Sequence, residues 1–106
     1  FKLADMLTEL VAARQMIRLA ASKLDNQDPQ ATTYCAMAKR FATDVGFTVC
    51  NDALQLLGGY GYIKEYPMER YVRDTRVHQI LEGTNEIMRV IVGRKLLMDG
   101  ALEVIQ

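Results

Sequence analysis

The chain lacks the features that mark several classes of protein. No apolar run approaches the roughly 20 residues that span a bilayer, so no membrane-spanning helix is predicted and no membrane partner is expected. Thirteen basic residues balance thirteen acidic ones, so the net charge gives no reason to expect nucleic acid as a partner. The first residues, Phe1-Lys-Leu-Ala-Asp5, resemble neither a signal peptide nor a transit peptide.

Cysteine, histidine and proline are also scarce. Cys35 and Cys50 fall in one expected helix, and their fifteen-residue separation, at about 1.5 Å per residue, exceeds disulfide reach. They are therefore expected to be free thiols, which fits a reducing compartment. Neither cysteine belongs to a CxxC motif, and His78 is the single histidine, so no metal site is predicted.

What the sequence does contain is helical periodicity. Half of its 106 residues are hydrophobic, enough for one small domain with a modest core. Apolar spacings of three and four predict helices over about 1–24, 29–57, 67–74 and 84–98, with Gly100 closing the last and 101–106 as a tail. With no strand pattern and no repeat, the fold class is predicted to be an all-α antiparallel helical bundle. Because the chain starts inside a helical pattern without a cap, it is expected to be a fragment of a longer protein.

Three interruptions of this pattern and one charged pair have local interpretations. Asp28 can cap the second helix, with Pro29 in its first position. Gly46 suggests a tight helix crossing, and the glycines at 58, 59 and 61 stop the helix. These glycines lack the spacing of a dinucleotide or phosphate-binding loop, so a Rossmann or P-loop fold is excluded. Arg73 and Asp74 are expected to form a partly buried ion pair.

The segment His78-Gln-Ile-Leu-Glu-Gly-Thr-Asn-Glu86 contains the candidate chemistry. Ile80 and Leu81 would shield the Glu82 carboxylate from water, which disfavours its charged form and makes it a better base. Gly83 permits a positive φ, and Thr84 is a natural N-cap for the last helix. On these residues alone, the alternative is that Glu82 is an ordinary solvated loop residue.

Three separated motifs resemble the C-terminal helical domain of the acyl-CoA dehydrogenases. They are Gln55-Leu-Leu-Gly-Gly-Tyr-Gly-Tyr62, the stretch from Tyr71 to Thr84, and Ile91-Val-Gly-Arg94. The resemblance runs from about Phe1 to Leu97 and is greatest to short-chain and branched-chain members, isobutyryl-CoA dehydrogenase among them. It implies that the chain is one domain of a longer FAD-dependent flavoenzyme, an oxidoreductase that desaturates an acyl-CoA thioester to a trans-2-enoyl-CoA.

The same resemblance implies roles for individual residues. Glu82 matches the catalytic base, and its N–H would donate to the thioester carbonyl. Leu81, Gly83 and Arg94 match substrate-side positions, although Arg94 follows Glu82 by about three turns and would need a fold-back or a neighbouring subunit. The FAD-contact positions are Gln55, Leu56, Leu57, Gly58 and Gly59, which approach a cofactor held mainly by a neighbouring subunit, together with Thr84, Asn85 and Glu86. Several relatives have Gln where Glu86 stands, and its added negative charge would need a partner.

The partners implied are an acyl-CoA substrate, further copies of the full-length chain in a dimer or tetramer, and electron-transfer flavoprotein as the electron acceptor. The compartment implied is the bacterial cytoplasm or the mitochondrial matrix. Two alternatives stay open, an acyl-CoA oxidase and a non-catalytic helical module that self-associates. The isolated chain is expected to be inactive, because four helices cannot build the rest of a flavin pocket.

Overall fold

The computed structural model describes residues 1–99, which form helices joined by short loops. The elements in chain order are α1 (Lys2–Asp25), α2 (Ala31–Leu57), α3 (Gly59–Tyr62), α4 (Met68–His78) and α5 (Asn85–Asp99). The predicted all-α class is confirmed, and α1, α2, α4 and α5 correspond to the four expected helices. The predicted stop at Gly100 and the tail 101–106 lie outside the described residues.

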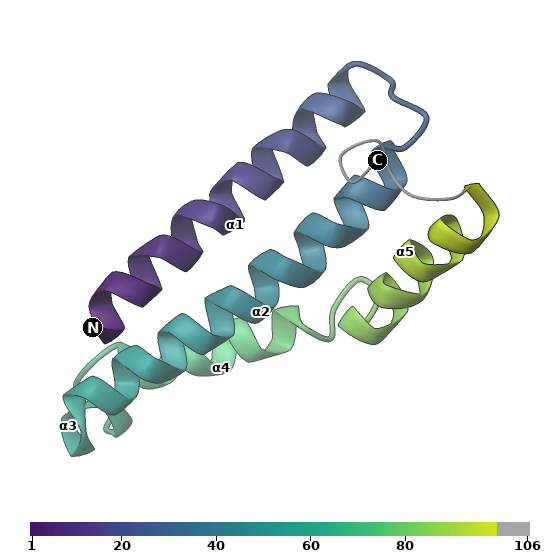
Figure 1. Ribbon diagram of the computed structural model, residues 1–106. Coiled ribbons are helices and arrows are strands. Elements are labelled where there is room, and N and C mark those ends of the chain that lie inside the picture. The colour runs from purple at the N-terminus through teal and green to yellow at the C-terminus, as the bar shows by residue number, and fades with distance from the viewer. Residues whose placement is uncertain (100–106) are drawn as a thin grey trace.

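Helix α2 is the axis around which the other helices are arranged (Figure 1). It packs against all four of them, and among the described residues the only other helix pair in contact is α3 with α4. Helix α1 runs antiparallel to α2 along its length, while α5 lies beside the N-terminal half of α2 (Figure 1). The loop between α4 and α5 is therefore held against the middle of α2.

The contact between α1 and α2 depends on small side chains. Ala13 and Ala20 of α1 are buried, as are Ala36 and Ala38 of α2, and alanines let two helices approach closely. Tyr34 is the largest side chain buried there, at 2% exposed, and the Lys23 ammonium lies 4.9 Å from the centre of its ring. These contacts hold α1 against α2, so that the two helices form a helical hairpin.

Helix α2 begins at Ala31, two residues after the predicted first position at Pro29. The reason is a local turn in which the Gln30 N–H donates to the Asp28 carboxylate at 2.7 Å, a bond that competes with helix formation. Lys23 pairs with the same carboxylate at 3.3 Å. Asp28 thus organises the turn between α1 and α2, but it does not cap α2.

The glycines behave differently from one another. The tight crossing predicted at Gly46 is wrong for the described residues, because a Cβ added there would meet nothing within 4 Å. Gly58 ends α2 with a φ of +63°. A one-turn helix, α3, follows directly, and in it a Cβ on Gly61 would lie 2.5 Å from the Leu54 carbonyl oxygen. Gly61 is therefore the position where a close backbone approach requires glycine.

The partly buried Arg73–Asp74 ion pair is also wrong. Arg73 pairs instead with Glu69 one turn earlier on α4, at 2.9 Å, and its side chain is 68% exposed. Adjacent helical residues point in different directions, whereas residues four apart share a face. Glu69 raises the pKa of Arg73 by accepting this hydrogen bond.

Much of the apolar surface of α1 is uncovered. Leu3, Leu7, Ile17 and Leu24 are between 49% and 70% exposed, because α2 is the only described helix that packs on α1. Within residues 1–99, no helix combines the length and apolarity needed to cross a bilayer. The exposed α1 surface is of the kind that another protein surface covers.

The environment of Asp28 predicts a pH-dependent contribution to stability. The Gln30 N–H, and then Lys23, hold the pKa of Asp28 below its ordinary value. A depressed folded-state pKa stabilises the fold above the unfolded-state pKa of about 3.9, and this stabilisation is lost as pH falls through the folded-state pKa. Asp28→Asn should therefore lower the thermal midpoint at neutral pH, by an amount that shrinks on acidification.

Thermal unfolding followed by circular dichroism across acid and neutral pH measures this difference. Asp25→Asn removes an equal charge three residues earlier and serves as the control. An Asp28→Asn effect that is the same at every pH would contradict the assignment.

Candidate active site

Glu82 lies in a tight loop between α4 and α5. The Leu81 N–H donates to the Val77 carbonyl at 2.9 Å, and the Asn85 N–H reaches back to the Gln79 carbonyl at 3.1 Å. Glu82 and Gly83 both have a positive φ, of 55° and 89°. The positive φ predicted for Gly83 is confirmed, and Glu82 shares it at a cost of about 1 kcal/mol or more for a residue with a Cβ.

The predicted burial of Glu82 is wrong within this chain. Glu82 is exposed, while Ile80 and Leu81 are 51% and 46% exposed. Leu81, Glu82 and Gly83 are three exposed residues in succession. Shielding of the carboxylate from water would therefore have to come from a surface outside the described residues.

Thr84 closes the loop as the predicted N-cap of α5. Its hydroxyl oxygen accepts the Ile87 N–H at 3.3 Å, and its carbonyl accepts the Met88 N–H at 3.0 Å. These bonds satisfy backbone donors in the first turn of the helix. The Glu82 carboxylate thus stands just ahead of the N-terminus of α5.

Asn85 is the buried polar side chain at this junction, at 3% exposed. Its amide nitrogen donates to Asp44 Oδ1 at 2.6 Å and to Thr43 Oγ1 at 2.9 Å. Its oxygen accepts from Lys39 Nζ at 2.7 Å, and the same ammonium donates to the Gly83 carbonyl at 2.7 Å. The side chain of Asn85 is thus fully engaged with α2, so its predicted FAD contact would be left to its backbone.

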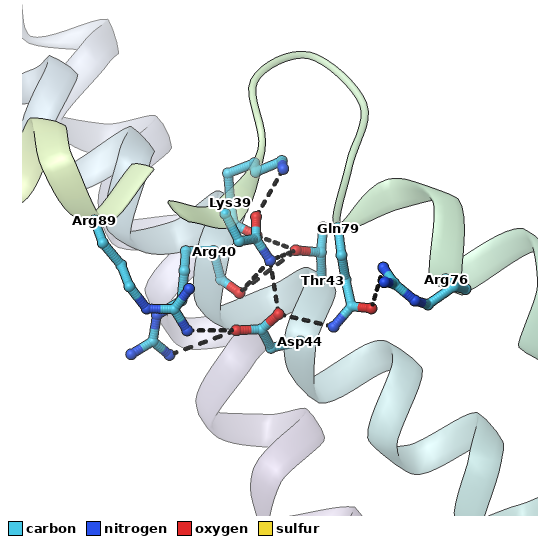
Figure 2. Close-up of polar contacts among 8 residues, drawn as sticks. Lys39, Arg40, Thr43, Asp44, Arg76, Gln79 and Arg89 are labelled. Carbon is cyan, nitrogen blue, oxygen red and sulfur yellow. Dashed lines mark hydrogen bonds and ion pairs between the residues drawn. The ribbon is translucent and has the colours of Figure 1, made fainter. Parts of the chain in front are cut away.

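Asp44 of α2 connects both ends of the loop (Figure 2). Gln79, at the end of α4, donates to Asp44 Oδ1 at 2.9 Å, and Arg89 of α5 pairs with Oδ2 at 3.2 Å. Arg76 donates in turn to the Gln79 side chain at 3.1 Å. We call Lys39, Thr43, Asp44, Gln79 and Asn85 the anchor cluster. This cluster was not predicted, although Lys39, Thr43 and Asp44 gather on the polar side of an otherwise apolar helix and could have signalled it.

The predicted cofactor residues at the end of α2 form a separate patch. Gln55, Leu56, Leu57, Gly58 and Gly59 are all exposed. A Cβ at Gly58 or Gly59 would meet nothing within 4 Å, so the backbone there is open to a ligand or another chain. Gly58 follows Asp44 by fourteen residues, or roughly 21 Å along α2. The two groups of predicted site residues are therefore not brought together in one chain.

The remaining predicted residues lie on α5. Glu86 is exposed in its first turn. Arg94 is also exposed and follows Asn85 by nine residues, or roughly 14 Å along the helix. Helix α5 thus carries Arg94 away from Glu82, with no fold-back among the described residues.

A pocket in the described part of the chain lies elsewhere. It measures about 410 Å³ and is lined by Met16 of α1, by α2 residues, and by α5 residues such as Met88, Val92 and Leu96. None of the predicted site residues lines it. Within residues 1–99, no group of three or more His, Cys, Asp or Glu side chains is placed to hold a metal ion.

Residues 1–97 match the family model described as acyl-CoA dehydrogenase, C-terminal domain. The chain belongs to the acyl-CoA dehydrogenase family. The resemblance of the three motifs is thereby confirmed, over the range that the sequence predicted. The loop that carries Glu82 and the patch at Gly58 and Gly59 are consequently parts of an acyl-CoA dehydrogenase domain.

Relatives of this chain agree with this assignment. The chain is 57% identical over 99 residues to the mitochondrial isobutyryl-CoA dehydrogenase of Bos taurus and 60% identical to that of Dictyostelium discoideum. Each comparison covers 93% of this chain but 24% of the relative. The butyryl-CoA dehydrogenase structure from Megasphaera elsdenii superposes with a TM-score of 0.87 at 45% identity, covering 92% of this chain and 25% of that one. The chain therefore spans about a quarter of the length of these relatives.

Proposed function

We propose that this chain is the C-terminal helical domain of a FAD-dependent acyl-CoA dehydrogenase, and that Glu82 is the base that removes the α-proton of the acyl-CoA. The observation that carries the proposal is the placement of Glu82. Its carboxylate stands on an exposed loop with a defined left-handed backbone, anchored to α2 from both ends. A base must be both accessible to substrate and fixed in place, and this loop meets both needs.

The proposed chemistry divides between this chain and its cofactor. FAD, when bound, supplies the acceptor for the hydride that leaves the β-carbon of the acyl group. Glu82 takes the α-proton, and the electron pair left behind forms the α,β double bond. The Glu82 N–H would donate to the thioester carbonyl and stabilise the negative charge that develops there.

The exposed patch from Gln55 to Gly59 fits a contact with FAD. The glycines present no Cβ, and the space beside them is open, so backbone N–H groups could approach phosphate oxygens. Because this patch lies roughly 21 Å along α2 from the anchor cluster, we propose that it contacts the FAD of a neighbouring subunit. Thr84 and Glu86 would contact the flavin beside Glu82, and Arg94 would act on a different part of the substrate.

The proposal extends to assembly, acceptor and compartment. The uncovered apolar surface of α1 supports contact with the rest of the full-length protein and with further copies of it, as a dimer or tetramer. The electron acceptor would be electron-transfer flavoprotein. The relatives named mitochondrial and the two free cysteines support the mitochondrial matrix or, in a bacterium, the cytoplasm.

A non-catalytic helical module is the second candidate, favoured by the same exposed α1 surface. An acyl-CoA oxidase would use the same residues and differ in the access of oxygen to the reduced flavin. Visible flavin absorbance in the purified full-length protein, and its bleaching by acyl-CoA without oxygen, separates the enzyme from the module. Oxygen consumption during turnover separates the oxidase from the dehydrogenase.

Glu82→Gln in the full-length protein should lower kcat by about 10²- to 10⁴-fold, because an amide keeps the shape of the side chain but cannot accept the proton. Bound FAD and the thermal midpoint should stay close to those of the parent protein. Glu9→Gln, which neutralises an exposed carboxylate on α1, is the matched control. If Glu82→Gln retains more than about a tenth of the parent rate, Glu82 is not the base.

Gly59→Val should lower the amount of FAD retained per chain, because a branched Cβ would occupy the open space where the cofactor approaches the backbone. FAD content is measured by absorbance after gel filtration. Gly46→Val places the same side chain at an open glycine within α2 and controls for the effect of valine at a helical glycine. Equal FAD retention in both variants and the parent would show that Gly59 only follows the end of α2.

A further inference from the structure

Lys39 makes the contact that links α2 directly to the backbone beside Glu82. Its ammonium donates to the Gly83 carbonyl and to Asn85 Oδ1, both at 2.7 Å. The two acceptors lie one and three residues after Glu82, and 44 and 46 residues after Lys39. One side chain thus binds both the peptide that follows Gly83 and the first residue of α5.

The backbone that this contact restrains is an unfavourable one. Glu82 and Gly83 adopt φ values of 55° and 89° in succession, and only glycine enters that region without a steric cost. Such a conformation persists when the surroundings impose it. The Val77 carbonyl holds the Leu81 N–H before this pair, and Lys39 holds the Gly83 carbonyl after it.

We propose that Lys39 is a positioning residue for the Glu82 base, because its ammonium clamps the Gly83 carbonyl and thereby fixes the left-handed backbone from which the Glu82 carboxylate extends. The inference rests on the proposed function of Glu82. It goes beyond that function by assigning the orientation of the base to a lysine on a different helix. Charge-assisted hydrogen bonds of this length are stronger than neutral ones, which suits a contact that must hold a strained loop.

The anchor cluster also contains side chains that hold the helices and not the Glu82 turn. These are Asn85, Thr43 and Asp44. Their side-chain bonds attach the start of α5 to α2, and Gln79 attaches the end of α4. None of these bonds reaches the Gly83 carbonyl. Loss of the Lys39 ammonium should therefore loosen the Glu82 turn while the helices on either side stay attached.

Lys39→Met in the full-length protein tests this proposal, because methionine keeps the length of the side chain and removes its donors. The expected result is a fall in kcat of about 10- to 100-fold, with KM within about twofold of the parent value and FAD content unchanged. The matched control is Lys23→Met, which removes another partly buried lysine of the fold, paired with Asp28 at 3.3 Å. That variant should lose thermal stability and keep its kcat.

A second readout isolates the base from the flavin chemistry. An acyl-CoA whose β-carbon bears no hydrogen cannot lose a hydride, so the exchange of its α-protons in D₂O, followed by NMR, reports on proton removal alone. Lys39→Met should lower the rate of α-proton exchange by the same factor by which it lowers kcat. Should that variant fail to fold, Lys39→Gln is measured in its place, and its shorter, uncharged side chain should also reduce exchange.

The outcomes separate this inference from the proposed function. If the parent protein exchanges α-protons, Glu82→Gln does not, and the folded Lys39 variant exchanges at the parent rate, then Lys39 is only structural and the inference is overturned. If Lys39→Met loses FAD or raises KM without lowering the exchange rate at saturating acyl-CoA, the inference is also overturned. If the parent itself shows no exchange, or Glu82→Gln retains it, the proposed function fails, and the role of Lys39 fails with it.

Discussion

The buried amide of Asn85 is the interaction on which the arrangement of this domain depends. An amide buried to 3% exposure is tolerated only when its donors and acceptor are paired, and here the partners are Lys39, Thr43 and Asp44 on α2. That requirement fixes where α5 begins on α2. Because Asp44 also accepts from Gln79, the end of α4 is fixed at the same point, and the loop that carries Glu82 has little freedom left.

This constraint explains how a small domain can present reactive groups without enclosing a site. Helix α2 contacts every other helix of residues 1–99, holding Glu82 near its middle and the open Gly58–Gly59 backbone at its end. Both Glu82 and the two glycines are exposed, and the pocket between α1, α2 and α5 is lined by other side chains. A domain of this form contributes parts to sites that other surfaces complete, consistent with a chain that spans about a quarter of the relatives it matches.

Periodicity predicted the helices well, since apolar residues at spacings of three and four must share a face. Thr84 as the N-cap of α5 and the positive φ of Gly83 followed from local chemistry, and both are confirmed. Two failed predictions were local, because Asp28 does not cap α2 and Arg73 pairs with Glu69 of its own helix and not with its neighbour Asp74. The other two, the burial of Glu82 and the close crossing at Gly46, concerned contacts between separate segments. The anchor cluster was missed for the same reason, because the contacts of Lys39 and Asp44 with Asn85 span more than forty residues and depend on the path of the loop.

Amide hydrogen exchange of the full-length protein, comparing the parent with Asn85→Ala, tests most directly whether the anchor cluster holds the Glu82 loop. The N–H groups of Leu81 and Asn85 are hydrogen-bonded within the segment, so their exchange reports on its opening. Removal of the buried amide takes one hydrogen-bond partner from each of Lys39, Thr43 and Asp44, at a cost of about 1–3 kcal/mol. Exchange in residues 79–86 should therefore accelerate by about tenfold or more, while α1 keeps its protection. Equal exchange in this segment in both proteins would contradict the central role of Asn85.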